Sequence, residues 1–99
     1  MNKIYLDDNE YNVTGFSRYT QMNGDQINSY ADVQFADVTD YSALSALVGQ
    51  TITSIRIKSN DITIYNLNNI LAKVSRINEN MYNDKMNISA QILFNPANE

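Results

Sequence analysis

The side chains of this chain that could do chemistry are carboxylates, tyrosines, lysines and arginines, because the sequence holds no histidine and no cysteine. Histidine is the side chain whose pKa lies nearest neutrality, and the cysteine thiolate is a common nucleophile and metal ligand. Acid–base catalysis would therefore need a carboxylate, tyrosine or lysine with a strongly shifted pKa. We expect a protein that is not an enzyme.

An acidic run at Asp7-Asp8-Asn9-Glu10 suggests a hard-cation site, since Ca²⁺ and Mg²⁺ prefer oxygen ligands. The run lacks the Asp-x-Asp-x-Asn-Gly spacing with a distant glutamate that calcium loops use, and the same residues make a good polar turn. The three glycines, Gly15, Gly24 and Gly49, stand alone, so they do not form a phosphate-binding loop. We expect neither a metal nor a cofactor.

Tyrosine and basic side chains in two alternating segments are candidates for an interface. The chain has seven tyrosines and no tryptophan, and the strand registers given below place Tyr5, Tyr65 and Tyr82 on outward faces. Tyrosine is enriched in interface cores because it buries much area and keeps a polar tip, although it is also an ordinary strand former. Arg56 and Lys58 lie on the same outward face, and Arg56 opposite Tyr65 is the first pair to test.

Charge is unevenly divided along the chain. Residues 1–50 hold seven acidic residues and two basic ones, whereas residues 51–99 hold four acidic and five basic ones. Such a bipolar subunit could stack head to tail with copies of itself, or present an acidic face to a basic partner. The alternative is a set of ordinary solvated loops. The acidic candidates for an interface are Asp32, Asp37 and Asp40.

Nucleic acid and membranes are not expected partners. A formal net charge of −4 with a pI near 4.5 is opposite to the clustered Lys and Arg that displace phosphate counterions. No stretch approaches the roughly 20 apolar residues of a membrane span, and the N-terminal segment lacks the apolar centre of a secretory signal. We expect partners that are other protein subunits, including copies of this chain.

Four pairs of turn-forming residues separate segments that alternate between polar and apolar side chains. Asn and Asp tolerate the left-handed backbone of two-residue hairpin turns, and Asn-Gly is the strongest such signal. Four β-hairpins are therefore predicted, with turns at Asp8-Asn9, Asn23-Gly24, Asn60-Asp61 and Asn83-Asp84.

Each predicted turn fixes a register, because residues equidistant from a two-residue turn oppose each other. The turn at Asn60-Asp61 pairs Ile57 with Ile64 on the inward face, and Arg56 with Tyr65 and Lys58 with Thr63 on the outward face. The turn at Asn23-Gly24 pairs Phe16 with Ala31, and the turn at Asp8-Asn9 pairs Leu6 with Tyr11. Apolar residues coincide in each register, so the predicted sheet has one apolar face.

Residues 86–94 give the clearest strand, with Met86, Ile88, Ala90, Ile92 and Phe94 on one face. Residues 40–48 predict a short helix, because Thr39 or Asp40 can cap it, apolar residues recur at helical spacing and Gly49 ends it. Residues 69–81 fit a strand or a second helix, and the turn that follows favours the strand.

The predicted fold is mainly β: a small antiparallel sandwich or partly closed barrel of about seven short strands with one short helix. The alternative is an α+β sheet with a second helix over residues 69–81. Residues 1–94 are expected to form a single domain, followed by a frayed tail over residues 95–99.

The run VTDYSALSALVGQTITSIRIKSNDITIYNLNNILAKVSRINENMYNDKMNISAQILF, residues 38–94, has a short helix, a Thr/Ile/Ser strand, an Asn/Asp turn and a closing β-hairpin. In this order it resembles the small β-rich virion proteins of tailed bacteriophages and of prophages of Gram-positive bacteria. The resemblance implies a subunit of the tail, baseplate or head–tail junction, made in the bacterial cytoplasm and then built into the virion. It carries no residue signature.

A second hypothesis comes from the acidic composition. A small inhibitor carried by a mobile element, such as an anti-CRISPR protein, could mimic DNA and occupy the basic groove of a host nuclease. Its carboxylates at Asp25, Asp32, Asp37 and Asp40 would then be spaced along one face like phosphates.

Overall fold

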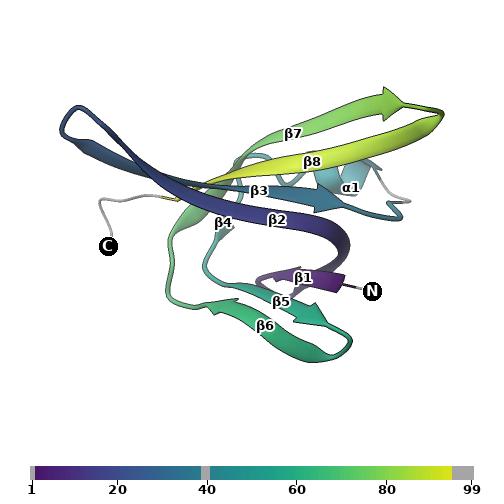
Figure 1. Cartoon of the computed structure of the whole chain (residues 1–99), viewed down its shortest axis with the longest axis horizontal. Helices are drawn as coiled ribbons and strands as arrows, with labels where there is room; N and C mark the ends of the chain where they lie inside the picture. Colours follow the sequence, from purple (N-terminus) through teal and green to yellow (C-terminus); the bar gives the residue numbers. More distant parts are fainter. Residues whose placement is uncertain (1, 39–40, 95–99) are drawn as a thin grey trace.

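The computed structural model describes residues 2–38 and 41–94, and it is mainly β as predicted (Figure 1). One sheet holds its eight strands in the order β4-β7-β8-β3-β2-β1-β5-β6, and all neighbouring strands are antiparallel. The sheet has one more strand than expected, because residues 51–59 form two strands. The elements are β1 (Asn2–Leu6), β2 (Asn9–Asn23), β3 (Gln26–Phe35), α1 (Tyr41–Ser45), β4 (Thr51–Ile52), β5 (Ile55–Ser59), β6 (Ile62–Leu67), β7 (Ala72–Tyr82) and β8 (Lys85–Phe94).

The sheet bends sharply along β2, which belongs to two layers. Its first residues pair with β1, its later residues pair with β3, and a bulge between Val13 and Gly15 marks the change. Bulges bend a strand and increase its local twist. In Figure 1, β1, β5 and β6 consequently lie beneath the layer of β2, β3, β8 and β7.

The core fills the space between these layers. Alternate residues of β3 and β8 are buried, which confirms the predicted inward row on β8 from Ile88 to Phe94. The predicted helix exists as α1, and it adds Leu44 to the core, with Leu47 just beyond it. The proposed caps Thr39 and Asp40 lie outside the described residues. The buried apolar residues are Ile4, Leu6, Val13, Ala31, Val33, Phe35, Leu44, Leu47, Ile52, Ile55, Ile57, Ala72, Val74, Ile88, Ala90, Ile92 and Phe94.

A single carboxylate holds the two layers together where the sheet nearly closes. Asp7, in the turn after β1, accepts hydrogen bonds at Oδ1 from Thr53 N at 3.0 Å, Thr53 Oγ1 at 2.9 Å and Ser54 N at 3.0 Å. The backbone N of Asp7 donates to Ser54 O at 3.0 Å. Thr53 and Ser54 connect β4, at one edge of the sheet, to β5, so the sheet forms a partly closed barrel.

Two of the four turns lie where the sequence predicts them, and two are displaced by one residue. Asn60-Asp61 and Asn83-Asp84 have positive φ at both residues, as a type I′ turn requires. The other two turns centre on Asp7-Asp8 and Gly24-Asp25, with positive φ at the first residue, the position that type II′ turns give to glycine.

These displacements change which residues pair across the strands, but they do not change which face of the sheet a side chain lies on. Phe16 pairs with Val33 instead of Ala31, and Leu6 pairs with Asn9 instead of Tyr11. Moving a turn by one residue moves every partner by two, and side chains two apart on a strand share a face. The predicted inward residues Leu6 and Ala31 are therefore still buried, and Phe16 packs against the core. Thr14, predicted to oppose Val33, is instead exposed at the bulge.

The predicted register of the β5–β6 hairpin is wrong beyond its first two pairs. Lys58 pairs with Thr63 as expected, but Ile57 pairs with Tyr65, and Ile64 is the extra residue of a bulge. Arg56 consequently pairs with Asn66 and not with Tyr65.

The ambiguous stretch 69–81 is a strand, as the sequence favours. β7 runs from Ala72 to Tyr82, and the alternative of a second helix is wrong. Residues 95–99, the predicted tail, lie outside the described residues.

We expect Asp7→Ala to lower the free energy of unfolding by about 2 kcal/mol, because it strips the acceptor from Thr53 and Ser54. Urea denaturation measures the effect. Asp8→Ala is the matched control, since Asp8 is an exposed neighbour in the same turn, and its effect should stay within about 0.5 kcal/mol. Equal effects of the two substitutions would show that Asp7 does not hold the layers together.

Candidate protein-interaction surfaces

The structure brings three predicted interface residues together on the outward face of β1 and β5. Tyr5 pairs with Arg56 in the β1–β5 register, and the Arg56 guanidinium carbon lies 4.6 Å from the centre of the Tyr5 ring. Lys58 Nζ lies 5.6 Å from the same ring centre. A cation over a tyrosine face is favourable, so the ring holds both basic side chains near it.

A carboxylate and a third basic side chain border this cluster. Lys3 Nζ lies 2.8 Å from Glu10 Oε1, and a hydrogen bond between Glu10 and Tyr5 raises the pKa of the Tyr5 hydroxyl. The hydrogen bond from Lys3 also lowers the pKa of Glu10 and raises that of Lys3. We call Lys3, Tyr5, Glu10, Arg56 and Lys58 the cation–tyrosine cluster. It keeps an excess of positive charge at neutral pH and suits a partner surface that carries carboxylates.

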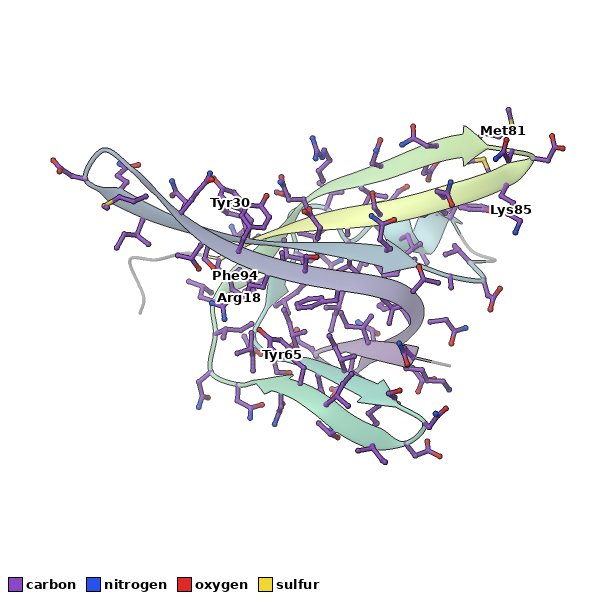
Figure 2. All side chains as sticks on the ribbon, viewed as in Figure 1. Arg18, Tyr30, Tyr65, Met81, Lys85 and Phe94 are labelled. Carbon is purple, nitrogen blue, oxygen red and sulfur yellow. The ribbon has the colours of Figure 1, made fainter. Side chains whose placement is uncertain are left out.

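Tyr65 does not belong to the cation–tyrosine cluster. The bulge in β6 turns Tyr65 inward, where its ring centre lies 5.2 Å from that of Phe16 on β2 (Figure 2). The predicted Arg56–Tyr65 pair is therefore wrong, and Tyr5 takes the place of Tyr65. Tyr82 pairs with Lys85 at the end of β7, and its side chain lies outside what the structure describes.

The structure does not gather the predicted acidic residues. Asp32 lies on the outward face of β3, opposite Ser17 on one side and Gln91 on the other. Asp37 follows β3 in a loop and has a positive φ of 51°, whereas Asp25 lies in the β2–β3 turn. Asp40 lies outside the described residues. These carboxylates therefore come from a turn, a strand and a loop.

A surface that the sequence analysis missed lies at the end of the β2–β3 hairpin. Among the described residues, β3 pairs with β8 only from Ser29 onward, so the preceding part of the hairpin, residues 20–28, is a two-stranded arm. Met22 and Ile27 oppose each other on this arm, and 71% and 53% of their surfaces are exposed.

The β7–β8 hairpin forms a second arm at the opposite end of the molecule (Figure 1). Pairing of β3 with β8 ends at Phe35 and Ile88, and beyond it β7 and β8 pair with each other alone. Met81 opposes Met86 there, with exposed fractions of 75% and 48%. Met86 continues the inward row of β8, so the apolar face of the sheet runs past the core onto this arm.

A polar contact seals the core where the β2–β3 arm begins. The Arg18 guanidinium carbon lies 4.5 Å from the centre of the Phe94 ring, and Arg18 Nε donates to the buried Ser29 Oγ at 3.3 Å (Figure 2). Thr20 Oγ1 donates to the same oxygen at 3.1 Å. Met22 and Ile27 therefore lie beyond a closed end of the core.

Within residues 2–38 and 41–94, no group of three or more acidic side chains is placed to hold a metal ion. In the same part of the chain, no helix has the length and apolar character needed to cross a membrane. The candidate surfaces for contacts with other macromolecules are the cation–tyrosine cluster and the two arms.

Comparison of the sequence with protein-family models finds no match, and comparison with characterised proteins finds none either.

We expect Lys3→Gln to raise the pKa of Glu10 towards its ordinary value, because the hydrogen bond from Lys3 is the largest cause of its lowering. The lowered pKa means that the Lys3–Glu10 contact contributes at neutral pH and is lost as the pH falls through the pKa of Glu10. Carbon NMR of the side-chain carboxyl measures this pKa. Lys73→Gln, on the distant β7, is the control and should leave it unchanged.

Proposed function

We propose that this protein is a non-enzymatic structural subunit of a larger protein assembly, acting through contacts with other subunits. The resemblance of residues 38–94 to small virion proteins suggests which kind of assembly: the tail, baseplate or head–tail junction of a tailed bacteriophage or prophage. Such a subunit is made in the bacterial cytoplasm and ends in the virion.

The observation that carries the proposal is the pair of apolar side chains at the end of each arm. Met22 with Ile27, and Met81 with Met86, leave large apolar areas in water on two-stranded hairpins. An isolated hairpin is at best marginally stable in water, and exposed apolar patches mark interaction sites. A neighbouring subunit that covers the arms would bury these side chains and stabilise the hairpins.

The position of the arms supports an extended assembly. They project from opposite ends of the molecule, so contacts made by one arm leave the other arm available (Figure 1). Two different contacts on one subunit produce a ring when the rotation closes and a stack when it does not. The cation–tyrosine cluster adds a charged contact on a third surface, between β1 and β5.

The acidic-inhibitor hypothesis remains an alternative of the sequence analysis. Its carboxylates Asp25, Asp32 and Asp37 lie in separate elements, so no single observation favours it over the assembly proposal. The inhibitor would be a monomer that blocks a nuclease, which distinguishes it from an assembly subunit.

Replacing the apolar pairs tests the proposal. We expect Met22→Thr/Ile27→Thr and Met81→Thr/Met86→Thr to lower the mass of the assemblies formed by the wild-type chain. The physical reason is that each change removes apolar area from an interface and retains a good strand former. Size-exclusion chromatography with light scattering, over a wide range of protein concentrations, measures the mass against the 11.3 kDa monomer.

The outward pairs on the same arms supply the matched controls. Gln21 opposes Asn28 on the first arm and Asn80 opposes Asn87 on the second, one residue from the apolar pairs. Their double substitutions with threonine should leave the assembly mass unchanged. A wild-type chain that stays monomeric at all concentrations, or arm and control variants that behave alike, would contradict the proposal.

A further inference from the structure

One edge of the sheet is open and carries no charge. β6, with the sequence Ile-Thr-Ile-Tyr-Asn-Leu, pairs with β5 on one side and ends the strand order on the other. Proteins usually protect such edges with charged residues, prolines or bulges that turn the edge away. The part of β7 that extends beyond β4 carries Arg76 and Glu79, whereas β6 has no charged residue and no proline. β6 does carry a bulge, at Ile64, so an added strand must pair through the residues on either side of it, Thr63 and Asn66.

The hydrogen-bonding groups of this edge follow from the turn before it. Residues that flank a two-residue turn form a hydrogen-bonded pair, here Ser59 with Ile62, and hydrogen-bonded and non-hydrogen-bonded pairs alternate along β5. Thr63, opposite Lys58, and Asn66, opposite Arg56, are thus in non-hydrogen-bonded pairs. Their backbone N–H and C=O groups point to the open side.

The inward and outward side chains of β6 are arranged symmetrically about the middle of the strand. Ile62 and Leu67, at the two ends, share the inward side, since Leu67 opposes the buried Ile55. Thr63 and Asn66 face outward. In the middle, the bulge places Ile64 and Tyr65 together in the lining of one cavity of about 330 Å³.

We propose that a second copy of this chain pairs with β6 in antiparallel fashion, about a two-fold axis between Ile64 and Tyr65. This inference rests on the proposed assembly function and names one of its contacts. Thr63 then lies opposite Asn66 of the second copy, and each such pair exchanges both backbone hydrogen bonds. Ile62 lies opposite Leu67 of the second copy, and Ile64 opposite its Tyr65.

A second copy fits this edge because its side chains and charges match it. The register sets apolar residues against apolar ones, and it covers Ile62 and Ile64, whose exposed fractions are 67% and 60%. No like charges meet across the new pair of strands, since β6 is uncharged. The nearest basic side chains, Lys58 of one copy and Arg56 of the other, are three strand spacings apart, or about 14 Å. That distance exceeds the Debye length of about 8 Å at physiological salt.

A contact made by one short strand is smaller than a standard interface, so we expect a dimer that depends on protein concentration. Disulfide trapping is suited to such a contact, and the natural chain has no cysteine to interfere. The test variant is Thr63→Cys/Asn66→Cys. Within one chain these residues oppose Lys58 and Arg56, which are two residues apart on β5, so their Cα atoms are about 7 Å apart, at the limit of what a disulfide can bridge. A disulfide within one chain leaves the mass at that of the monomer, so only the disulfide between two copies gives a dimer band.

Under mild oxidation, we expect the double variant to give a disulfide-linked dimer on a non-reducing gel. Thr63→Cys and Asn66→Cys alone should give at least about threefold less, because each faces a different residue across the two-fold axis. Ile64→Lys, added to the double variant, should also reduce the yield, since it puts like charges at the axis. Equal yields from the double and single variants, or no effect of Ile64→Lys, would overturn the inference.

The outcomes for this edge and for the arms are separate. A missing cross-link, together with arm-dependent assemblies of the wild-type chain, would overturn the β6 contact and leave the proposed function standing. A cross-link that forms equally in the arm variants, whose assembly mass equals that of the wild type, would support the β6 contact and contradict the role of the arms.

Discussion

The hydrogen bonds that the Asp7 carboxylate accepts from Thr53 and Ser54 are the constraint on which the rest of the structure depends. A sheet of eight strands in which β4 and β5 follow each other in sequence but lie far apart in strand order must bend back on itself. The bulge at Val13–Gly15 permits the bend, and Asp7 fixes its extent. The core between the layers exists because both are present: without the bend, the inward row of β8 would face water.

The same bend explains why apolar side chains remain outside. The core is as long as the segment over which β3 and β8 pair, from Ser29 to Phe35 on β3, whereas the β2–β3 and β7–β8 hairpins are longer. Their inward rows continue to Met22 and Met86, which are exposed. These side chains are exposed because the hairpins are longer than the segment over which β3 and β8 pair.

The sequence predicts which side chains face the core better than it predicts which residues pair across neighbouring strands. Alternation identifies the inward row of β8, and turns with positive φ at both residues, such as Asn60-Asp61, lie where expected. The displaced turns depend on tertiary structure, since the φ of Asp7 accompanies its contacts with Thr53 and Ser54. The bulge at Ile64 leaves no mark in the alternation of the β6 sequence, so the pattern predicts the wrong face for Tyr65 and does not pair Tyr5 with Arg56. The sequence does not indicate the arms, because the residue pattern of one strand does not show where the neighbouring strand ends.

The surfaces proposed to contact other subunits are separate from the interactions that hold the fold together. Arg18 covers Phe94 and, with Thr20, satisfies the hydroxyl of the buried Ser29, so the core is closed before the β2–β3 arm begins. Ile62 and Ile64 likewise lie outside the buried cluster to which Ile55 and Ile57 belong. Because these exposed side chains contribute little to burial within one chain, folding does not account for their apolar character. A partner that covers them would account for it, since burying apolar area stabilises the assembled state by about 25 cal/mol per Å².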